Sequence, residues 1–201
     1  MRNEAPTHRQ RQAQATQALI VAKARELFLE RGYTQTTIEA IAGYAGVAVS
    51  TVYAVFGSKR GILRLIREDW HHQTQIKEFM ITARSQTDPV KLLDGLAEAT
   101  RLQWQMGSQV TAIYRGAAAA DRHAAAELAA ALAGRRKALD EFTQNLSPHL
   151  RPGLELHRAS AIVRVLCRAE VYEELVELSG WTAESYQEWL SAALKHELLA
   201  N

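Results

Sequence analysis

A short uncharged segment around Thr51 combines hydroxyl groups with small apolar side chains. The hydroxyls of Ser50, Thr51 and Tyr53 can donate hydrogen bonds to phosphate oxygens. The methyl groups of Val49 and Ala54 suit contact with thymine methyls in a major groove. A neutral face of this kind is unusual for a helix that faces only water. It predicts contact with duplex DNA.

Two short helices joined by a glycine turn would present this segment. Thr36 and Glu39 have the spacing of a capping box, so we expect the first helix to begin next to them. Gly46 can take the left-handed conformation that ends a helix. A second helix is expected over residues 49–55, and Ser58 then caps the helix that follows. The inward positions of this motif are Ile38, Ile41, Ala42, Ala45, Val52 and Phe56.

The net charge of +2 is distributed unevenly. Residues 1–70 carry ten Lys or Arg and six Asp or Glu, a net charge of +4, and the remainder carries −2. A basic first part beside a slightly acidic remainder is typical of a protein that touches phosphate with one part only. Lys59 lies in the first turn of a helix, where a nearby phosphate would explain a cation. Arg9 and Arg11 can reach a minor groove, although a solvated tail is the simpler interpretation.

Apolar residues recur at helical spacing along the rest of the chain, and no stretch alternates as a strand does. The pattern predicts an all-α protein. Asp88 followed by Pro89 marks one helix start, and breaks are expected near Gly107 and Gly116. The expected helices cover residues 16–31, 58–84, 89–105, 109–119, 122–146, 155–179 and 183–199.

Several classes of function lack their motifs in this sequence. The single cysteine, Cys167, has apolar neighbours and is interpreted as a core residue. His71 and His72 are adjacent, so on a helix they point about 100 degrees apart and cannot easily share a metal ion. No phosphate-binding glycine loop, zinc motif or nucleophile elbow is present, so neither an enzyme nor a cofactor is expected. Without a run of about 20 apolar residues or a signal peptide, a cytoplasmic protein is expected.

Aromatic and methionine side chains in the middle of the chain are candidates for a pocket that binds an apolar or aromatic effector. For each residue alone, ordinary core packing is the competing interpretation. The candidate ligand-binding residues are Trp70, Phe79, Met80, Trp104, Met106 and Tyr114.

The last two expected helices carry apolar residues in rows that resemble heptads. Pairing with a second copy into a four-helix bundle would bury these rows. The alternative is that they pack only on the chain's own body. The candidate dimerisation residues are Tyr172, Leu175, Val176, Trp189, Leu190 and Leu194.

Several short motifs in the first part of the chain form a recognisable pattern, and they are Ala24-Arg25-Glu26-Leu27-Phe28, Gly32-Tyr33, Thr36-Thr37, Ile41-Ala42, Ala45-Gly46-Val47, Tyr53 with Phe56, and Ser58-Lys59. With these motifs, residues 14–70 resemble the DNA-binding domain of the TetR/AcrR family of transcriptional regulators. The end of the chain, from Tyr172 to Leu190, resembles some members more loosely.

The resemblance implies a homodimer on a palindromic operator and a helical body in which a small molecule weakens DNA binding, usually with repression as the outcome. Ala48 departs from the serine or threonine of many members and loses a helix cap. Val55 departs from their tyrosine or histidine and loses a possible phosphate contact. The candidate DNA-binding residues are Thr37, Val49, Ser50, Thr51, Tyr53, Ala54 and Lys59.

The leading hypothesis is a dimeric repressor that a small hydrophobic ligand releases from its operator. Residues 1–13 would be a mobile basic arm. Residues 14–58 would form a three-helix helix-turn-helix domain, and residues 59–201 a helical bundle for ligand binding and dimerisation. Because residues 48–55 are so apolar, the alternative is a helical small-molecule binding or carrier protein whose first domain no longer binds DNA.

Overall fold

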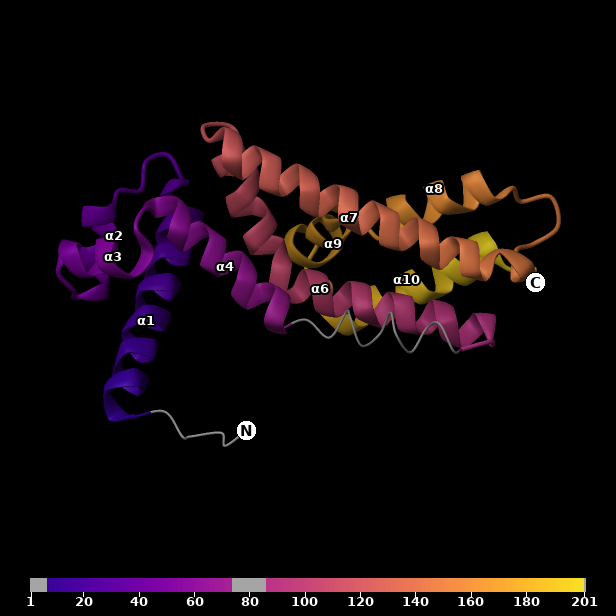
Figure 1. The fold of residues 1–201 in the computed structure, drawn as a ribbon. Helices are drawn as coiled ribbons and strands as arrows, with labels where there is room; N and C mark the ends of the chain where they lie inside the picture. Colours follow the sequence, from indigo (N-terminus) through magenta and orange to yellow (C-terminus); the bar gives the residue numbers. More distant parts are fainter. Residues whose placement is uncertain (1–6, 74–85, 201) are drawn as a thin grey trace, which may run out of the picture. The chain divides into compact units, whose positions relative to one another are not determined.

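The computed structural model describes residues 7–73 and 86–200, and every regular element in these ranges is helical (Figure 1). The prediction of an all-α fold is therefore confirmed. The elements are α1 (His8–Arg31), α2 (Ile38–Ala45), α3 (Val49–Phe56), α4 (Lys59–Gln73), α6 (Pro89–Ala118), α7 (Arg122–Leu146), a 3-10 turn η1 (Ser147–His149), α8 (Leu156–Leu166), α9 (Ala169–Tyr172), a π-helical segment η2 (Glu173–Leu178) and α10 (Ala183–Leu198).

The chain forms two compact units. The first unit holds residues 1–71 together with 112–126, and the second holds residues 72–111 together with 127–201. The first unit extends beyond residue 58, the expected end of the helix-turn-helix domain, and takes in the start of α4. The division into functional domains stays a prediction.

Helix α1 begins at His8, eight residues earlier than expected. The Thr7 hydroxyl accepts a hydrogen bond from the Gln10 amide, and the Gln10 side chain accepts one from the Thr7 amide, which forms a capping box. Residues 8–13, assigned to a mobile arm by the sequence, are therefore helical. The helix ends at Arg31 as expected, with Gly32 at a φ of 80°.

The start of α2 differs from the expected capping box. Thr37, not Thr36, is the N-cap, and its Oγ1 accepts from the Ala40 amide at 3.1 Å. Thr36 is buried, and its Oγ1 donates to the carbonyl oxygens of Gly32 at 2.8 Å and Leu27 at 3.2 Å. The prediction was wrong by one residue because packing against the end of α1 decides which hydroxyl is free to cap.

The core of the first unit joins α1 to the short helices and to α4. Its largest fully enclosed side chains are Ile20, Leu27, Ile41, Val52, Ile62 and Leu63. Ser58 caps α4 as predicted, since its Oγ accepts from the Gly61 amide at 3.2 Å. The expected continuation of this helix to residue 84 lies outside the described residues from 74 onwards.

Helix α6 begins at Pro89 as predicted and runs without interruption to Ala118. The Asp88 carboxylate caps it by accepting from the Val90 amide at 2.9 Å. The breaks predicted at Gly107 and Gly116 are absent from this helix. A glycine costs a helix interior about 1 kcal/mol relative to alanine, which burial of its neighbours can offset.

The expected helix over residues 155–179 is broken. α8 ends at Leu166, and α9 begins at Ala169, with Arg168 as its N-cap. The Cys167 carbonyl, at the break, accepts from Trp104 Nε1 at 3.1 Å and from Arg135 Nη2 at 2.7 Å. These donors come from α6 and α7, so no local pattern predicts the break. Cys167 itself is fully buried and free, as predicted for a core residue.

Helix α10 closes the core of the second unit. Thr182 caps it as predicted, with Oγ1 accepting from the Ser185 amide at 3.1 Å. Tyr186, Leu190, Leu194 and Leu198 are fully enclosed along its inner face. Within residues 7–73 and 86–200, no single helix has both the length and the apolar character to cross a membrane.

Candidate nucleic-acid interface

Helices α2 and α3 form a helix-turn-helix. They are bent by 109° at the break between them, within the range of about 90–120° for this motif. Gly46 ends α2 in the left-handed conformation at φ 65° and ψ 33°, as the sequence predicts. The Val47 amide then donates to the Ala42 carbonyl at 3.0 Å. The left-handed glycine and this hydrogen bond together produce the sharp turn that leads into α3.

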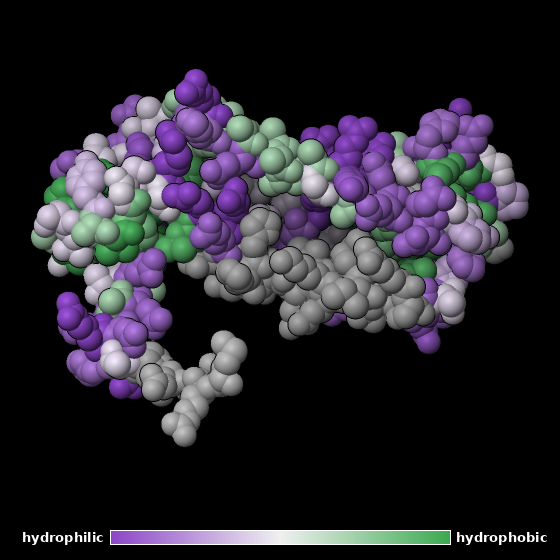
Figure 2. Space-filling view, viewed as in Figure 1, coloured by the Kyte–Doolittle hydropathy of each residue, from purple (hydrophilic) through white to green (hydrophobic). Residues whose placement is uncertain are grey.

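Helix α3 has one buried and one exposed side. Val52 is fully buried, whereas Tyr53 is 49% exposed and Val55 is 44% exposed. Ser50 and Ala54 are also exposed, and Val49 and Thr51 are half-buried. Figure 2 shows hydrophobic residues gathered on the surface over α2 and α3. The outward placement predicted for α3 is therefore observed, and its role in DNA contact remains a prediction.

The starts of the two short helices differ in their caps. Ala48 precedes α3 and offers no side-chain cap, as its residue type predicts. Thr37 is exposed and accepts from the Ala40 amide with its Oγ1, which leaves the hydroxyl proton free to donate. A phosphate at the start of α2 could accept that proton and would also be favoured by the helix dipole.

The sequence predicts a phosphate near Lys59, and the structure shows that Lys59 also has partners within the protein. Its Nζ donates to the carbonyl oxygens of Tyr33 at 2.7 Å and Thr36 at 2.8 Å, and it lies 4.3 Å from the centre of the Tyr33 ring. Burial lowers the pKa of the Lys59 ammonium. Two of its three N–H donors thus tie the start of α4 to the loop before α2.

Tyr44 adds an exposed aromatic group next to the motif. It is 53% exposed, and its hydroxyl accepts from Arg31 Nη2 at 2.5 Å. The Arg31 guanidinium also lies over the Tyr44 ring at 5.1 Å. Tyr44 was not among the predicted site residues, although it is the one aromatic residue of α2 and so a visible signal.

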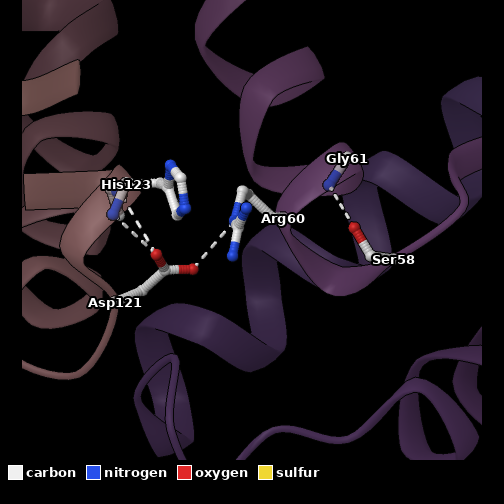
Figure 3. A network of polar contacts seen from close by, with 6 residues as sticks. Ser58, Arg60, Gly61, Asp121 and His123 are labelled. Carbon is white, nitrogen blue, oxygen red and sulfur yellow. Dashed lines mark hydrogen bonds and ion pairs between the residues drawn. The ribbon is translucent and has the colours of Figure 1, made fainter. Parts of the chain in front are cut away.

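A network at the start of α4 links it to the turn before α7 within the first unit (Figure 3). Arg60 Nε lies 3.0 Å from Asp121 Oδ2, and Asp121 Oδ1 accepts from the His123 amide at 2.8 Å. The hydrogen bond from this amide is the main cause that lowers the pKa of the Asp121 carboxyl. A hollow of about 550 Å³ lies beside the network, with Lys59 and Arg122 among its lining residues.

The predicted ligand-binding residues are not gathered at one place in the described part of the chain. Tyr114 is buried in the first unit, where its hydroxyl donates to the Leu63 carbonyl at 3.4 Å, and Trp70 is half-buried there. Trp104 is buried in the second unit. Phe79 and Met80 lie outside the described residues, as does the side chain of Met106.

The predicted dimerisation residues divide into two sets. Tyr172, Leu190 and Leu194 are between 0% and 4% exposed and belong to the chain's own core, so they have almost no surface left for a partner. Leu175, Val176 and Trp189 are only partly buried against that core. The spacing of the apolar residues alone did not separate these two sets.

Further apolar side chains that were not candidate dimerisation residues are exposed in the second unit, among them Val165, Leu178 and Trp181. Val165 is 56% exposed, Leu178 is 76% exposed and Trp181 is 38% exposed. Trp181 meets Trp189 edge to face, with 6.2 Å between the ring centres. We call Val165, Leu178 and Trp181 the exposed apolar set.

Comparison with known proteins finds a family match within the first unit. Residues 20–66 match the family model described as bacterial regulatory proteins, tetR family. No curated protein sequence matches the chain.

Solved structures share the fold over most of the chain. NalD, the secondary repressor of the MexAB-OprM multidrug efflux pump in Pseudomonas aeruginosa, is 21% identical, with a TM-score of 0.70 over 95% of this chain and 99% of that one. A SmeT–triclosan complex is 19% identical, with a TM-score of 0.71 over 93% of each chain. The regulator FadR from Bacillus subtilis in complex with stearoyl-CoA is 18% identical, with a TM-score of 0.65 over 88% of this chain and 96% of that one.

At these identities the likeness to the solved structures is one of fold, and the family model adds the link at the level of sequence. The match lies on the part of the chain that forms the helix-turn-helix. Residues 20–66 are therefore similar in sequence to the tetR family of bacterial regulatory proteins, and the chain as a whole is similar in fold to NalD.

Proposed function

We propose that the chain acts in the cytoplasm as a dimeric repressor on a palindromic operator and is released by a small-molecule effector. The observation that carries this proposal is the exposed side of α3, where Ser50, Tyr53 and Ala54 project from a helix with no charged residue. A helix of this kind enters a major groove with its first residues toward base edges.

Phosphate contacts would hold the recognition helix in register. The hydroxyls of Thr37, Ser50, Thr51 and Tyr53 are neutral donors suited to phosphate oxygens. With Val49 and Ala54 as the groups nearest the bases, sequence readout would depend on methyl contacts and on DNA shape more than on paired hydrogen bonds.

Dimerisation would use the partly buried Leu175, Val176 and Trp189 together with the exposed apolar set. An apolar surface of this kind is costly in water and is typical of an interface. A second copy of the chain is the partner that a palindromic operator requires, because each half-site binds one helix-turn-helix.

Effector binding is supported by analogy of fold. SmeT binds triclosan and FadR binds stearoyl-CoA, and both share this helical fold. In our proposal, a ligand in the second unit shifts the protein toward a form that binds the operator less well, by the difference in its affinity for the two forms.

Selection of bound fragments from a library of random duplex DNA tests the proposal. We expect enrichment of a palindrome whose half-sites are centred about one helical turn apart or a multiple of it. No enrichment would favour the alternative of a small-molecule binding or carrier protein. Enrichment of a single half-site would support DNA binding and contradict the dimer.

A further inference from the structure

Side chains from α6, α7 and α10 surround the break between α8 and α9 in the second unit. Arg135 is central to this group. Its guanidinium lies 4.6 Å from the centre of the Trp104 ring, Nη1 donates to Gln103 Oε1, and Nη2 donates to the Cys167 carbonyl at 2.7 Å. We call Arg135, Trp104, Cys167 and Tyr186 the Arg135 cluster.

Arg135 carries a positive charge without a carboxylate partner among the described residues. Both of its acceptors, the Gln103 amide and the Cys167 carbonyl, are neutral. A guanidinium has five N–H donors, so these two bonds leave three for another group. The side chain is half-buried, and burial lowers its pKa. A desolvated cation of this kind favours the approach of an anion.

Tyr186 supplies a second unused donor. Its side chain is fully buried, and its hydroxyl has no hydrogen-bond partner in the described part of the chain. A buried hydroxyl without a partner destabilises a folded protein, so its persistence needs a reason. Burial raises the pKa of the phenol, and the charge of Arg135 opposes that shift. The phenol is therefore neutral and able to donate.

We propose that the Arg135 cluster is the carboxylate-binding end of the effector site and that the effector is an aromatic or aliphatic carboxylic acid. The carboxylate would accept from the Arg135 guanidinium and from the Tyr186 hydroxyl, and its apolar part would lie against the Trp104 ring. The inference rests on the proposed function, because it gives a chemical class to the effector named there.

The cluster also suggests how a bound carboxylate acts on the fold. Tyr186 is enclosed, so ligand entry requires the side chains around it to move. Arg135 and Trp104 both hold the Cys167 carbonyl at the break between α8 and α9. A carboxylate on the remaining donors would draw the Arg135 guanidinium toward itself, weaken its bond to the Cys167 carbonyl and so change the geometry of α8, which carries Val165 of the exposed apolar set.

Thermal unfolding of the full chain tests the site directly. The probes are benzoate, salicylate, 2-naphthoate and decanoate, each beside its primary amide. We expect at least one carboxylate to raise the midpoint of unfolding in step with the logarithm of its concentration, as a ligand of the folded state does, and its amide to have a much smaller effect. An equal response to acid and amide, or no rise with any carboxylate, would overturn the proposal.

Matched variants locate the binding. Arg135→Gln should weaken the carboxylate by about tenfold or more, while Arg136→Gln on the exposed neighbouring residue should leave it unchanged. If Arg135→Gln fails to fold, Arg135→Lys keeps the charge but loses the planar fork and should also bind more weakly. Equal affinity in the Arg135 and Arg136 variants would contradict the site.

Tyr186→Phe gives a readout that a purely structural role would not. We expect it to raise the unfolding midpoint of the ligand-free protein, because it deletes a hydroxyl without a partner, and to weaken carboxylate binding. If the variant binds the carboxylate as tightly as the unchanged protein does, the Tyr186 hydroxyl does not contact the carboxylate. If a carboxylate binds the Arg135 cluster but does not change the affinity for the operator, the binding site is supported and the proposed effector response is refuted.

Discussion

A methyl group on Gly61 would lie 2.0 Å from the carbonyl oxygen of Phe56, because the first turn of α4 approaches the end of α3 at this point. The oxygen belongs to the backbone, so it cannot rotate away. Gly61 thereby allows α4 to begin directly after α3. We expect Gly61→Ala to lower the free energy of unfolding by about 1–3 kcal/mol through a forced backbone shift.

Chemical denaturation measures this loss. Gly43→Ala is the matched control, because Gly43 lies in α2 and a methyl group there meets no atom within 4 Å. The control should be neutral or stabilising by up to about 1 kcal/mol, since alanine favours a helix more than glycine does. Equal stability of the two variants would contradict the close approach.

Lys59 is expected to stabilise the first unit. Lys59→Met removes the donor to the Tyr33 and Thr36 carbonyls, and we expect the unfolding free energy to fall by about 1.5–3 kcal/mol. Arg64→Met, at an exposed position of the same helix, is the control and should cost much less. If Lys59 contacts a phosphate, Lys59→Met should also lower the magnitude of the slope of log affinity against log salt by about one, and an unchanged slope would assign Lys59 to folding alone.

Tyr53 and Thr51 are expected to bind phosphate through their hydroxyls. The double variant Tyr53→Phe with Thr51→Ala should weaken operator binding by about tenfold or more, with helix content unchanged. Because a neutral hydroxyl releases no counterion, the dependence of affinity on salt should not change. A gel shift with undiminished affinity would refute the assignment.

The exposed apolar set is expected to lie in the dimer interface. Leu178→Glu should convert the dimer into a 22.4 kDa monomer in sedimentation at low concentration, because a buried unpaired charge opposes association. Leu132→Glu is the control, since Leu132 is 52% exposed on α7 and is not a member of the exposed apolar set. A monomer in the unchanged protein would refute the dimer itself.

Asp121 is expected to make the stability of the first unit sensitive to acid. Its pKa is lowered in the fold, mainly by the hydrogen bond from the His123 amide, so its contribution is present above the unfolded pKa and is lost as the pH falls through the folded one. Asp121→Asn keeps an acceptor for the amide but cannot titrate. Its unfolding midpoint should therefore fall less steeply than that of the unchanged protein between about pH 5 and pH 2.

Arg60→Gln separates the two causes of the lowered pKa. It removes the ion pair at 3.0 Å but leaves the His123 amide bonded to Asp121. Most of the acid dependence should remain, because the amide is the larger cause. Parallel pH curves for the unchanged protein and Asp121→Asn would contradict a role for this carboxylate.

Features that depend on neighbouring residues along the chain were predictable. Gly46 ends α2 because only a residue without Cβ takes the left-handed conformation without cost. Asp88 and Thr182 cap α6 and α10 because their side chains reach amides two or three residues ahead. The outward placement of α3 follows from the helical spacing that buries Val52.

Features that depend on distant partners were not predictable. Thr36 does not cap α2 as expected, because its hydroxyl donates to carbonyl oxygens at the end of α1. Lys59 donates to carbonyl oxygens of residues more than 20 positions away in the chain. The break at Cys167 is held by donors from α6 and α7. Helical periodicity shows which side of a helix is apolar, but the choice between a core and an open surface requires the neighbours that only folding supplies.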